Sequence, residues 1–173
     1  MMVFLSYRYE RPPKKNEKDA CMNENTCFQD VWMGNTCYGC GPANHDGMHI
    51  KSRWSDDGQF VIAEYLADAK YNSGMPDVMY GGTVASLVDC HSIWTAIAFA
   101  YKSENRILGS EPLILCVTGK LSITFIKPTP ISKPLHLKAW VEGGIDRKVN
   151  VICELGPSGD MTARAEVTAV KIT

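Results

Sequence analysis

The segment YGGTVASLVD, at residues 80–89, combines residue types that suit chemistry on an acyl carbonyl. Gly81 and Gly82 allow close approach of a ligand, and a helix that begins here offers unpaired N–H groups with partial positive charge. Such a helix start can act as an oxyanion hole. Asp89 is the only acidic residue within residues 83–101, which contain no Lys or Arg. Because burying an unpartnered carboxylate is costly, Asp89 is expected either to be catalytic or to be held by backbone amides or a neighbouring hydroxyl.

The spacing of these residues carries a geometric consequence. Gly82 and Asp89 are seven residues apart, so on a helix they share a face but lie about 10 Å apart along the axis. One helix therefore cannot hold a carbonyl at its N-terminus and also bring its own carboxylate to that carbon. Two antiparallel helices related by a two-fold axis can do so. The spacing predicts a homodimer with sites shared between two chains, either alone or as a dimer of dimers.

The elements that must position these residues follow from hydrophobic patterning. Residues 82 to about 102 have a helical pattern that is apolar over most of the circumference, which is typical of a buried helix. Strand patterns separated by turn residues cover 48–54, 59–66, 113–126, 135–142, 148–155 and 161–172. Two strands, one long helix and four strands predict an α+β fold in which an antiparallel sheet wraps around a central helix.

The N-terminal region differs from the rest of the chain. Residues 1–34 are assigned to an N-terminal arm, polar and basic over the first 24 or so, with a short helix expected around 27–33. Residues 35–173 are assigned to the single folded domain.

Composition excludes several classes of function. The chain has 173 residues, of which 45% are hydrophobic and 21% charged, and its net charge is −1. This balance does not indicate the basic surface that nucleic-acid binding requires. The apolar stretch at the N-terminus is too short for a signal sequence. No membrane span and no cofactor are expected. The sequence therefore predicts a cytoplasmic protein without nucleic-acid or membrane partners.

The seven cysteines fit a reducing compartment, since their number is odd and they are scattered through apolar stretches. Cys37 and Cys40 form one C-x-x-C pair, and His45 and His49 would complete a four-ligand zinc set. However, no second C-x-x-C or H-x-x-x-H follows at finger spacing. The favoured interpretation is a tight glycine-rich turn with two packed thiols and no metal.

Three segments carry a family resemblance. Residues 80–89 resemble the HGG(x)₆D signature of hotdog-fold thioesterases, with the phenylacetate-degradation and 4-hydroxybenzoyl-CoA thioesterases as the nearest type. Residues 37–48, CYGCGPANHDGM, are similar to the CFGCGxxNxxGL segment of one branch, and residues 117–130 to a long strand that ends in a Lys-Pro turn. The resemblance covers residues 35–172. It implies a hotdog fold and an acyl-CoA substrate whose thioester is hydrolysed.

The resemblance also implies roles for individual residues. Asp89 matches the carboxylate that acts as general base or nucleophile, and Gly82 or its neighbour Gly81 matches the glycine whose N–H polarises the thioester carbonyl. Thr118 falls where related enzymes place a hydroxyl that positions the attacking water. Asn72 lies in a loop where some members carry a polar residue near that water. Tyr80 replaces the usual His and, as a phenol, can contact substrate only as a hydrogen-bonding group near neutral pH.

Three alternatives to a thioesterase remain at this point. The Tyr80 substitution is compatible with a non-catalytic protein that binds or senses acyl-CoA. A hotdog hydratase or dehydratase would need a catalytic histidine, for which His91 is the only candidate. A zinc-dependent interaction module would rest on the C-x-x-C pair alone. For an enzyme, the acyl pocket is expected to be lined by helix residues such as Val84, Ile93 and Trp94 and by residues 70–79.

Overall fold

The computed structural model describes residues 27–172 of the chain. In chain order its elements are η1 (Phe28–Val31), β1 (Arg53–Trp54), β2 (Val61–Tyr65), η2 (Ala69–Tyr71), α1 (Gly81–Ser103), β3 (Cys116–Phe125), β4 (Leu135–Glu142), β5 (Lys148–Gly156) and β6 (Ala163–Lys171). Most of the predicted arm, residues 1–26, lies outside the described residues. Within the segment 27–33, where a short helix was expected, the structure has the 3₁₀ helix η1.

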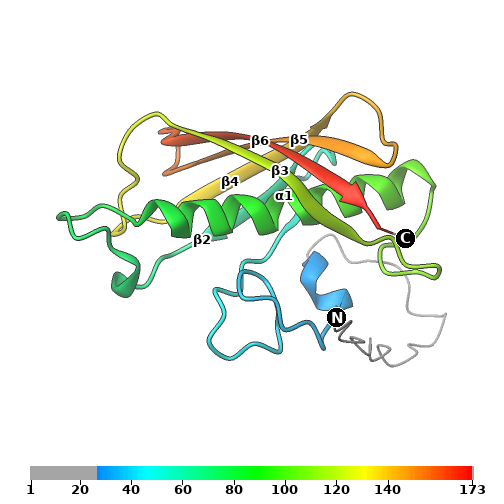
Figure 1. The fold of residues 1–173 in the computed structure, drawn as a ribbon, viewed down its shortest axis with the longest axis horizontal. Helices are drawn as coiled ribbons and strands as arrows, with labels where there is room; N and C mark the ends of the chain where they lie inside the picture. Colours follow the sequence, from blue (N-terminus) through cyan, green and yellow to red (C-terminus); the bar gives the residue numbers. More distant parts are fainter. Residues whose placement is uncertain (1–26, 173) are drawn as a thin grey trace, which may run out of the picture.

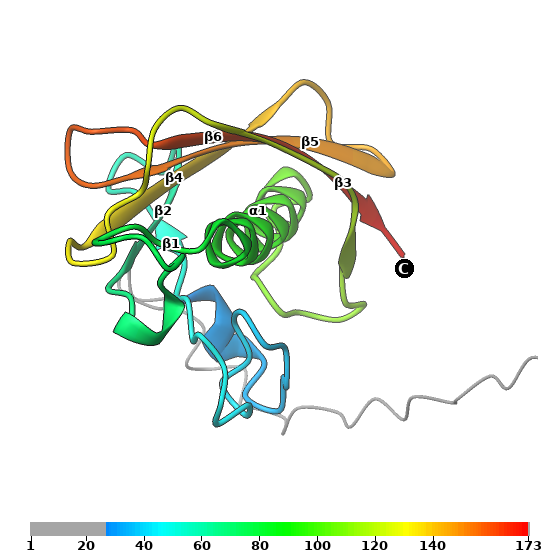
Figure 2. The ribbon, with the colours of Figure 1, turned by 60° about the vertical axis from the view of Figure 1, so that its left-hand side comes forward.

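The six strands form one antiparallel sheet in the order β1-β2-β4-β5-β6-β3. Figures 1 and 2 show the sheet curving over one side of α1, while the segment that contains η1 lies below the helix. The predicted α+β architecture, a sheet wrapped around one central helix, is confirmed.

Burial of α1 follows from its composition, since fourteen of its 23 residues are buried. Small side chains on both elements allow helix and sheet to pack closely: Ala96 and Ala100 on α1, and Ala163, Ala165 and Ala169 on β6, are all buried. By length and hydropathy alone α1 could cross a membrane, but 72% of its apolar window is buried inside the protein. That is the position of a core helix.

The first predicted strand is much shorter than expected. Only Arg53 and Trp54 pair with β2, whereas the pattern predicted a strand over 48–54. The N–H groups of Met48 and Ile50 donate instead to the carbonyls of Tyr38 and Gly39, at 2.8 and 3.0 Å. The backbone at 48–50 is therefore occupied by the cysteine-containing turn and is not available to the sheet.

A buried polar network joins η1 to the centre of α1. The side chain of Gln29 donates to Ser52 Oγ at 3.1 Å and accepts from the Ser52 N–H at 2.8 Å. Ser52 Oγ lies 2.9 Å from His91 Nδ1, and His91 Nε2 lies 3.2 Å from the Val61 carbonyl. The carbonyl requires a donor, so Nε2 carries the proton and Nδ1 accepts from Ser52. A neutral His91 satisfies every member of the chain.

We expect this network to make stability depend on pH. Burial lowers the pKa of His91 to about 4, against an ordinary value of 6.5, although the hydrogen bond to Val61 opposes the shift. As pH falls below 6.5, the unfolded chain binds a proton that the folded chain excludes. The free energy of unfolding should therefore fall by about 3 kcal/mol between pH 6.5 and 4. Urea denaturation at several pH values measures how the free energy of unfolding depends on pH. His91→Gln should remove the part of this dependence that His91 contributes; a variant with the wild-type dependence would contradict the prediction.

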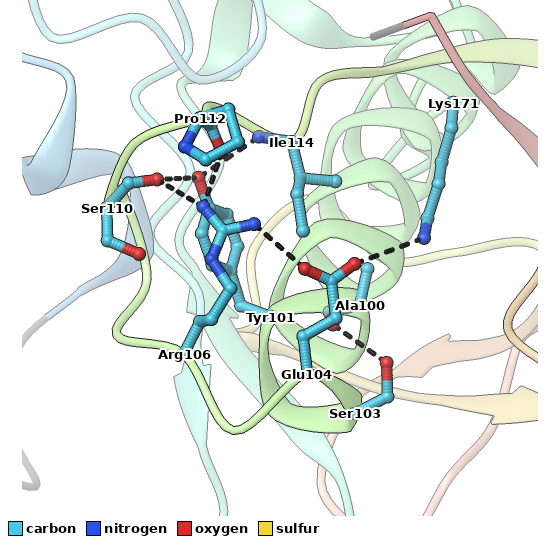
Figure 3. A network of polar contacts seen from close by, with 9 residues as sticks. All are labelled: Ala100, Tyr101, Ser103, Glu104, Arg106, Ser110, Pro112, Ile114 and Lys171. Atoms are coloured by element: carbon cyan, nitrogen blue, oxygen red, sulfur yellow. Dashed lines mark hydrogen bonds and ion pairs between the residues drawn. The ribbon is translucent and has the colours of Figure 1, made fainter.

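Figure 3 shows a second network, which fixes the connection from α1 to β3. The hydroxyl of Tyr101 donates to the Ser110 carbonyl at 3.0 Å and accepts from the Ile114 N–H at 3.1 Å. Arg106 donates to the carbonyls of Ser110 (2.7 Å) and Pro112 and pairs with Glu104 at 2.8 Å. These bonds hold the segment that leads into β3 against the C-terminal end of α1.

Removing the hydroxyl of Tyr101 should cost stability. Tyr101 is buried, so Tyr101→Phe leaves the Ile114 N–H without its partner and removes one of the donors to the Ser110 carbonyl. We expect the free energy of unfolding to fall by about 1–3 kcal/mol. Chemical denaturation of the variant beside the wild type tests this, and equal midpoints would show that the network does not hold the connection.

Strand β3 forms one edge of the sheet, since it pairs with β6 alone within the described residues. Leu121, Ile123 and Phe125 share one face of β3 because side chains alternate along a strand. Ile123 packs against the core, which identifies this as the helix-facing side, yet Leu121 is 37% and Phe125 52% exposed. A ten-residue edge strand with uncovered apolar side chains is typical of a pairing surface.

Candidate active site

Asp89 and Thr118 meet where α1 faces the start of β3. The Thr118 hydroxyl donates a hydrogen bond to Asp89 Oδ1. Asp89 is half-buried, and Thr118 is exposed on the edge strand. The structure thus brings together two of the residues singled out by the sequence, and it supplies the neighbouring hydroxyl that a half-buried carboxylate needs.

Both residues line a cavity of about 330 Å³. Its walls come from the C-terminal part of α1, from residues 31–40 and from residues 108–118. The apolar lining includes Val31, Trp32, Ile93, Trp94, Ile97, Leu108, Leu113 and Ile114. Asp89 is the only acidic side chain in this lining among the described residues. The cavity therefore combines an apolar chamber with one carboxylate.

Within one chain, the expected lining of this cavity is partly wrong. Ile93 and Trp94 line it as predicted, but Val84 is packed in the core and does not. Residues 70–79 are also absent from its walls. They lie before the start of α1, whereas the first α1 residue that lines the cavity is Asp89, two helical turns further on. The wall comes instead from residues 31–40 and 108–118, which sequence reasoning did not connect with the pocket.

Asn72 is used within its own loop. Its Oδ1 accepts from the Gly74 N–H at 2.8 Å, and its Nδ2 donates to the Ala69 carbonyl at 3.0 Å. The side chain is exposed and does not line the cavity that contains Asp89. Within one chain, the structure therefore does not bring Asn72 to the carboxylate.

Tyr80, Gly81 and Gly82 form the start of α1. The Tyr80 carbonyl accepts from the Thr83 and Val84 N–H groups at 2.9 and 3.3 Å. The N–H groups of Gly81 and Gly82 precede the first bonds of the helix, so they are available to an anion. A Cβ at position 82 would lie 2.4 Å from Cε1 of Tyr80. Glycine at 82 is therefore what allows the exposed Tyr80 ring to fold over the helix start.

The helix start and Asp89 occupy different places in a single chain. Neither Gly81 nor Gly82 lines the cavity that contains Asp89. Gly81 instead neighbours Phe125, because a Cβ there would lie 3.5 Å from Cζ of that ring. The start of β3 therefore carries Thr118, whose hydroxyl binds Asp89. The end of β3 carries Phe125, whose ring lies beside the N-terminus of α1.

Three cysteines gather in the same cavity wall. The sulfur atoms of Cys37, Cys40 and Cys90 all lie within 4.8 Å of one another. Hydrogen bonds from the thiols of Cys40 and Cys90 hold the pKa of the Cys37 thiol well below its usual range. The C-x-x-C motif pointed to the first two, but Cys90 was missed as a partner, because it meets them only through the packing of the 37–40 turn on α1. His45 and His49 are exposed and do not join the cluster.

His91 does not belong to the site. It is fully buried, both ring nitrogens are bound within the core, and it does not line the cavity. The hydratase interpretation depended on this residue, and the structure offers it no support.

Comparison with known proteins gives matches among solved structures. No protein-family model matches the chain, and no curated protein matches it. A thioesterase superfamily protein from Shewanella loihica PV-4 is 30% identical over 84% of this chain and 99% of that one, with a TM-score of 0.62. A phenylacetic acid degradation-related protein from Ralstonia eutropha JMP134 is 17% identical over 83% and 98%, with a TM-score of 0.60. A Bacillus halodurans protein solved with CoA is 17% identical over 73% and 76%, with a TM-score of 0.55.

The sheet wrapped around α1, shared with these structures, defines a hotdog-fold protein. With 30% identity to a relative that it covers almost completely, the chain belongs to the thioesterase superfamily. The resemblance noted in the sequence is thereby confirmed at the level of the family and the fold.

Proposed function

We propose that this protein is an acyl-CoA thioesterase, which hydrolyses a thioester to a free acid and CoA. One observation carries the proposal: a single carboxylate, Asp89, receives a hydrogen bond from Thr118 in the wall of an otherwise largely apolar cavity. An apolar acyl group fits such a chamber, and a carboxylate with a positioned hydroxyl is suited to activating water. Membership of the thioesterase superfamily supports the same reaction class.

The proposed reaction places the acyl group in the cavity with its thioester carbon facing Asp89. Asp89 either removes a proton from a water molecule held near Thr118, which then attacks the thioester carbon, or attacks that carbon itself. The thioester C=O becomes an oxyanion, which hydrogen bonds from N–H groups at the start of α1 stabilise. The C–S bond then breaks, and the CoA thiolate leaves and takes up a proton. After direct attack, water hydrolyses the anhydride between the acyl group and Asp89, which releases the free acid and restores the carboxylate.

The oxyanion donors in this proposal come from a second copy of the chain. In one chain, Thr118 near the start of β3 binds Asp89, while Phe125 at its end lies beside Gly81. Antiparallel pairing of two β3 edges places the start of each strand beside the end of its partner. The Asp89 of one protomer then approaches the helix start of the other. The exposed apolar edge of β3 supports this homodimer, either alone or within a dimer of dimers.

CoA as the thiol portion is also part of the proposal. The Bacillus halodurans protein that shares the fold was solved with CoA. We infer that this chain binds the same class of ligand, with the acyl group in the cavity. The cytoplasmic location inferred from cysteine usage stays a prediction.

A panel of acyl-CoA substrates tests the function. Acyl groups of varied length and aromaticity are assayed for release of free thiol, and binding of each is measured on the same preparation by calorimetry. We expect thiol release for those acyl groups that a cavity of about 330 Å³ accommodates. Absence of release across the panel, with intact folded protein, would contradict a thioesterase.

The second candidate is a non-catalytic acyl-CoA-binding protein. It is favoured by Tyr80, which stands where the resembled signature has His and makes no side-chain hydrogen bond at the helix cap. The same panel separates the two functions, because a binding protein would show tight binding without release of thiol.

A further inference from the structure

The three clustered thiols come from two elements that the fold brings together. Cys37 and Cys40 lie in the turn that precedes β1, and Cys90 lies on α1. The sulfurs of Cys37 and Cys90 are 3.7 Å apart. Zinc bound tetrahedrally by thiolates has Zn–S distances of about 2.3 Å, which place neighbouring sulfurs about 3.8 Å apart. The distance between the sulfurs of Cys37 and Cys90 therefore matches that between two ligands on one such ion.

The turn is shaped to bring its backbone close to Cys90. A Cβ at Gly39 would lie 2.3 Å from the Cys90 sulfur, so only glycine leaves space for it. The Cys37 N–H donates to Asn35 Oδ1 at 2.9 Å, and the Gly41 N–H donates to the Cys37 carbonyl at 2.8 Å. These bonds hold the turn in place independently of the thiols.

An N–H group also points at the cluster. Nε1 of Trp94, one turn after Cys90 on α1, donates to the sulfur of Cys40 at 3.3 Å. Donors of this kind stabilise thiolate ligands and fix their orientation around a metal. Cys40 and Cys90 are buried while Cys37 is exposed, so an ion has a route from solvent.

We propose that Cys37, Cys40 and Cys90 bind one Zn²⁺ ion as three thiolates, with the fourth position open to water from the cavity that Asp89 lines. Within residues 27–172, no histidine, carboxylate or further cysteine joins the three sulfurs. Binding displaces the protons that the thiols still carry and consumes no oxidant or reductant. The ion would tie the 37–40 turn to α1, and so fix one wall of the cavity. This site goes beyond the proposed hydrolysis, in which zinc takes no step.

Metal binding by the reduced full-length protein tests the proposal. After removal of metal with a chelator, the protein is titrated anaerobically with Co²⁺ and then with Zn²⁺. We expect one ion per chain, visible d–d bands and near-ultraviolet thiolate-to-cobalt charge transfer, all lost when Zn²⁺ replaces Co²⁺. Competition with a chromophoric chelator gives the Zn²⁺ affinity.

Variants decide whether the cluster is the site. Cys37→Ser, at an exposed position that folding tolerates, should lower Zn²⁺ affinity by more than the roughly 10–100-fold typical of outer-shell changes. Cys116→Ser is the matched control, because Cys116 lines the same cavity outside the cluster and should keep wild-type affinity. Wild-type protein without charge-transfer bands, or bands of undiminished intensity and wild-type affinity in Cys37→Ser, would overturn the proposal. Neither readout requires thioester hydrolysis, so the result is independent of the proposed function.

Discussion

Asp89→Asn is expected to lower the turnover of acyl-CoA by about 100-fold or more, because the variant keeps the shape of the side chain but loses its negative charge. The amide can neither take a proton from water nor attack the thioester. The KM should change little, since the apolar cavity that receives the acyl group is intact. Steady-state thiol release, with substrate affinity measured beside it, checks both parts.

If Asp89 has only a structural role, a different result is expected. Replacing a hydrogen-bonded carboxylate would then lower the free energy of unfolding by about 1–3 kcal/mol, and activity would fall only as far as folding does. Melting temperature and turnover are therefore measured on one preparation, with the exposed Asp46→Asn as a matched control. A folded Asp89→Asn variant with wild-type turnover would exclude the mechanism.

The second large effect is expected from the edge of β3. Leu121→Glu combined with Phe125→Glu places two charges on the exposed apolar row of β3. Buried in a dimer, these charges would lack partners, so the variant should be a monomer near 19.2 kDa by light scattering. Without the partner's helix start, turnover should fall by about 100-fold or more, the typical cost of losing an oxyanion donor.

Ser122→Glu is the matched control for this edge. Ser122 is exposed on the opposite face of β3, so its charge should remain in water and leave assembly and turnover unchanged. A double variant that stays dimeric, or an active wild-type monomer, would show that β3 is not the pairing surface.

The fold was predictable because its strongest patterns are local. The helix expected over 82–102 is α1 at Gly81–Ser103, and the strand expected over 135–142 is β4 with the same bounds. In both, periodicity and flanking turn residues are sufficient. The strand expected over 48–54 is mostly absent, because its N–H groups bond to residues 38 and 39, a tertiary contact that no local pattern encodes.

The site was less predictable for the same reason. A hydroxyl partner for Asp89 was one of the alternatives raised by the cost of burying a carboxylate, and the resemblance supplied Thr118. The third thiol, Cys90, approaches Cys37 only because the turn at residues 37–40 packs against α1. Sequence spacing alone does not reveal this packing. The bonds of His91 to Ser52 and Val61 likewise join three distant segments.

Mixed dimers test most directly whether one site is built from two chains. One variant, Asp89→Asn, is paired in a mixed dimer with a second, Gly81→Pro. Proline at 81, the first helical position, removes one N–H of the helix start; the extended Tyr80 before it suits proline, and a Cβ there meets Phe125 at an ordinary contact distance of 3.5 Å. Each variant alone should be nearly inactive. Purified mixed dimers, made by co-expression with two different tags, should recover about half of the wild-type thiol release per dimer, because one of the two shared sites has both Asp89 and Gly81 intact. Mixed dimers no more active than either variant alone would show that carboxylate and oxyanion donor act within one chain, and would contradict the shared site.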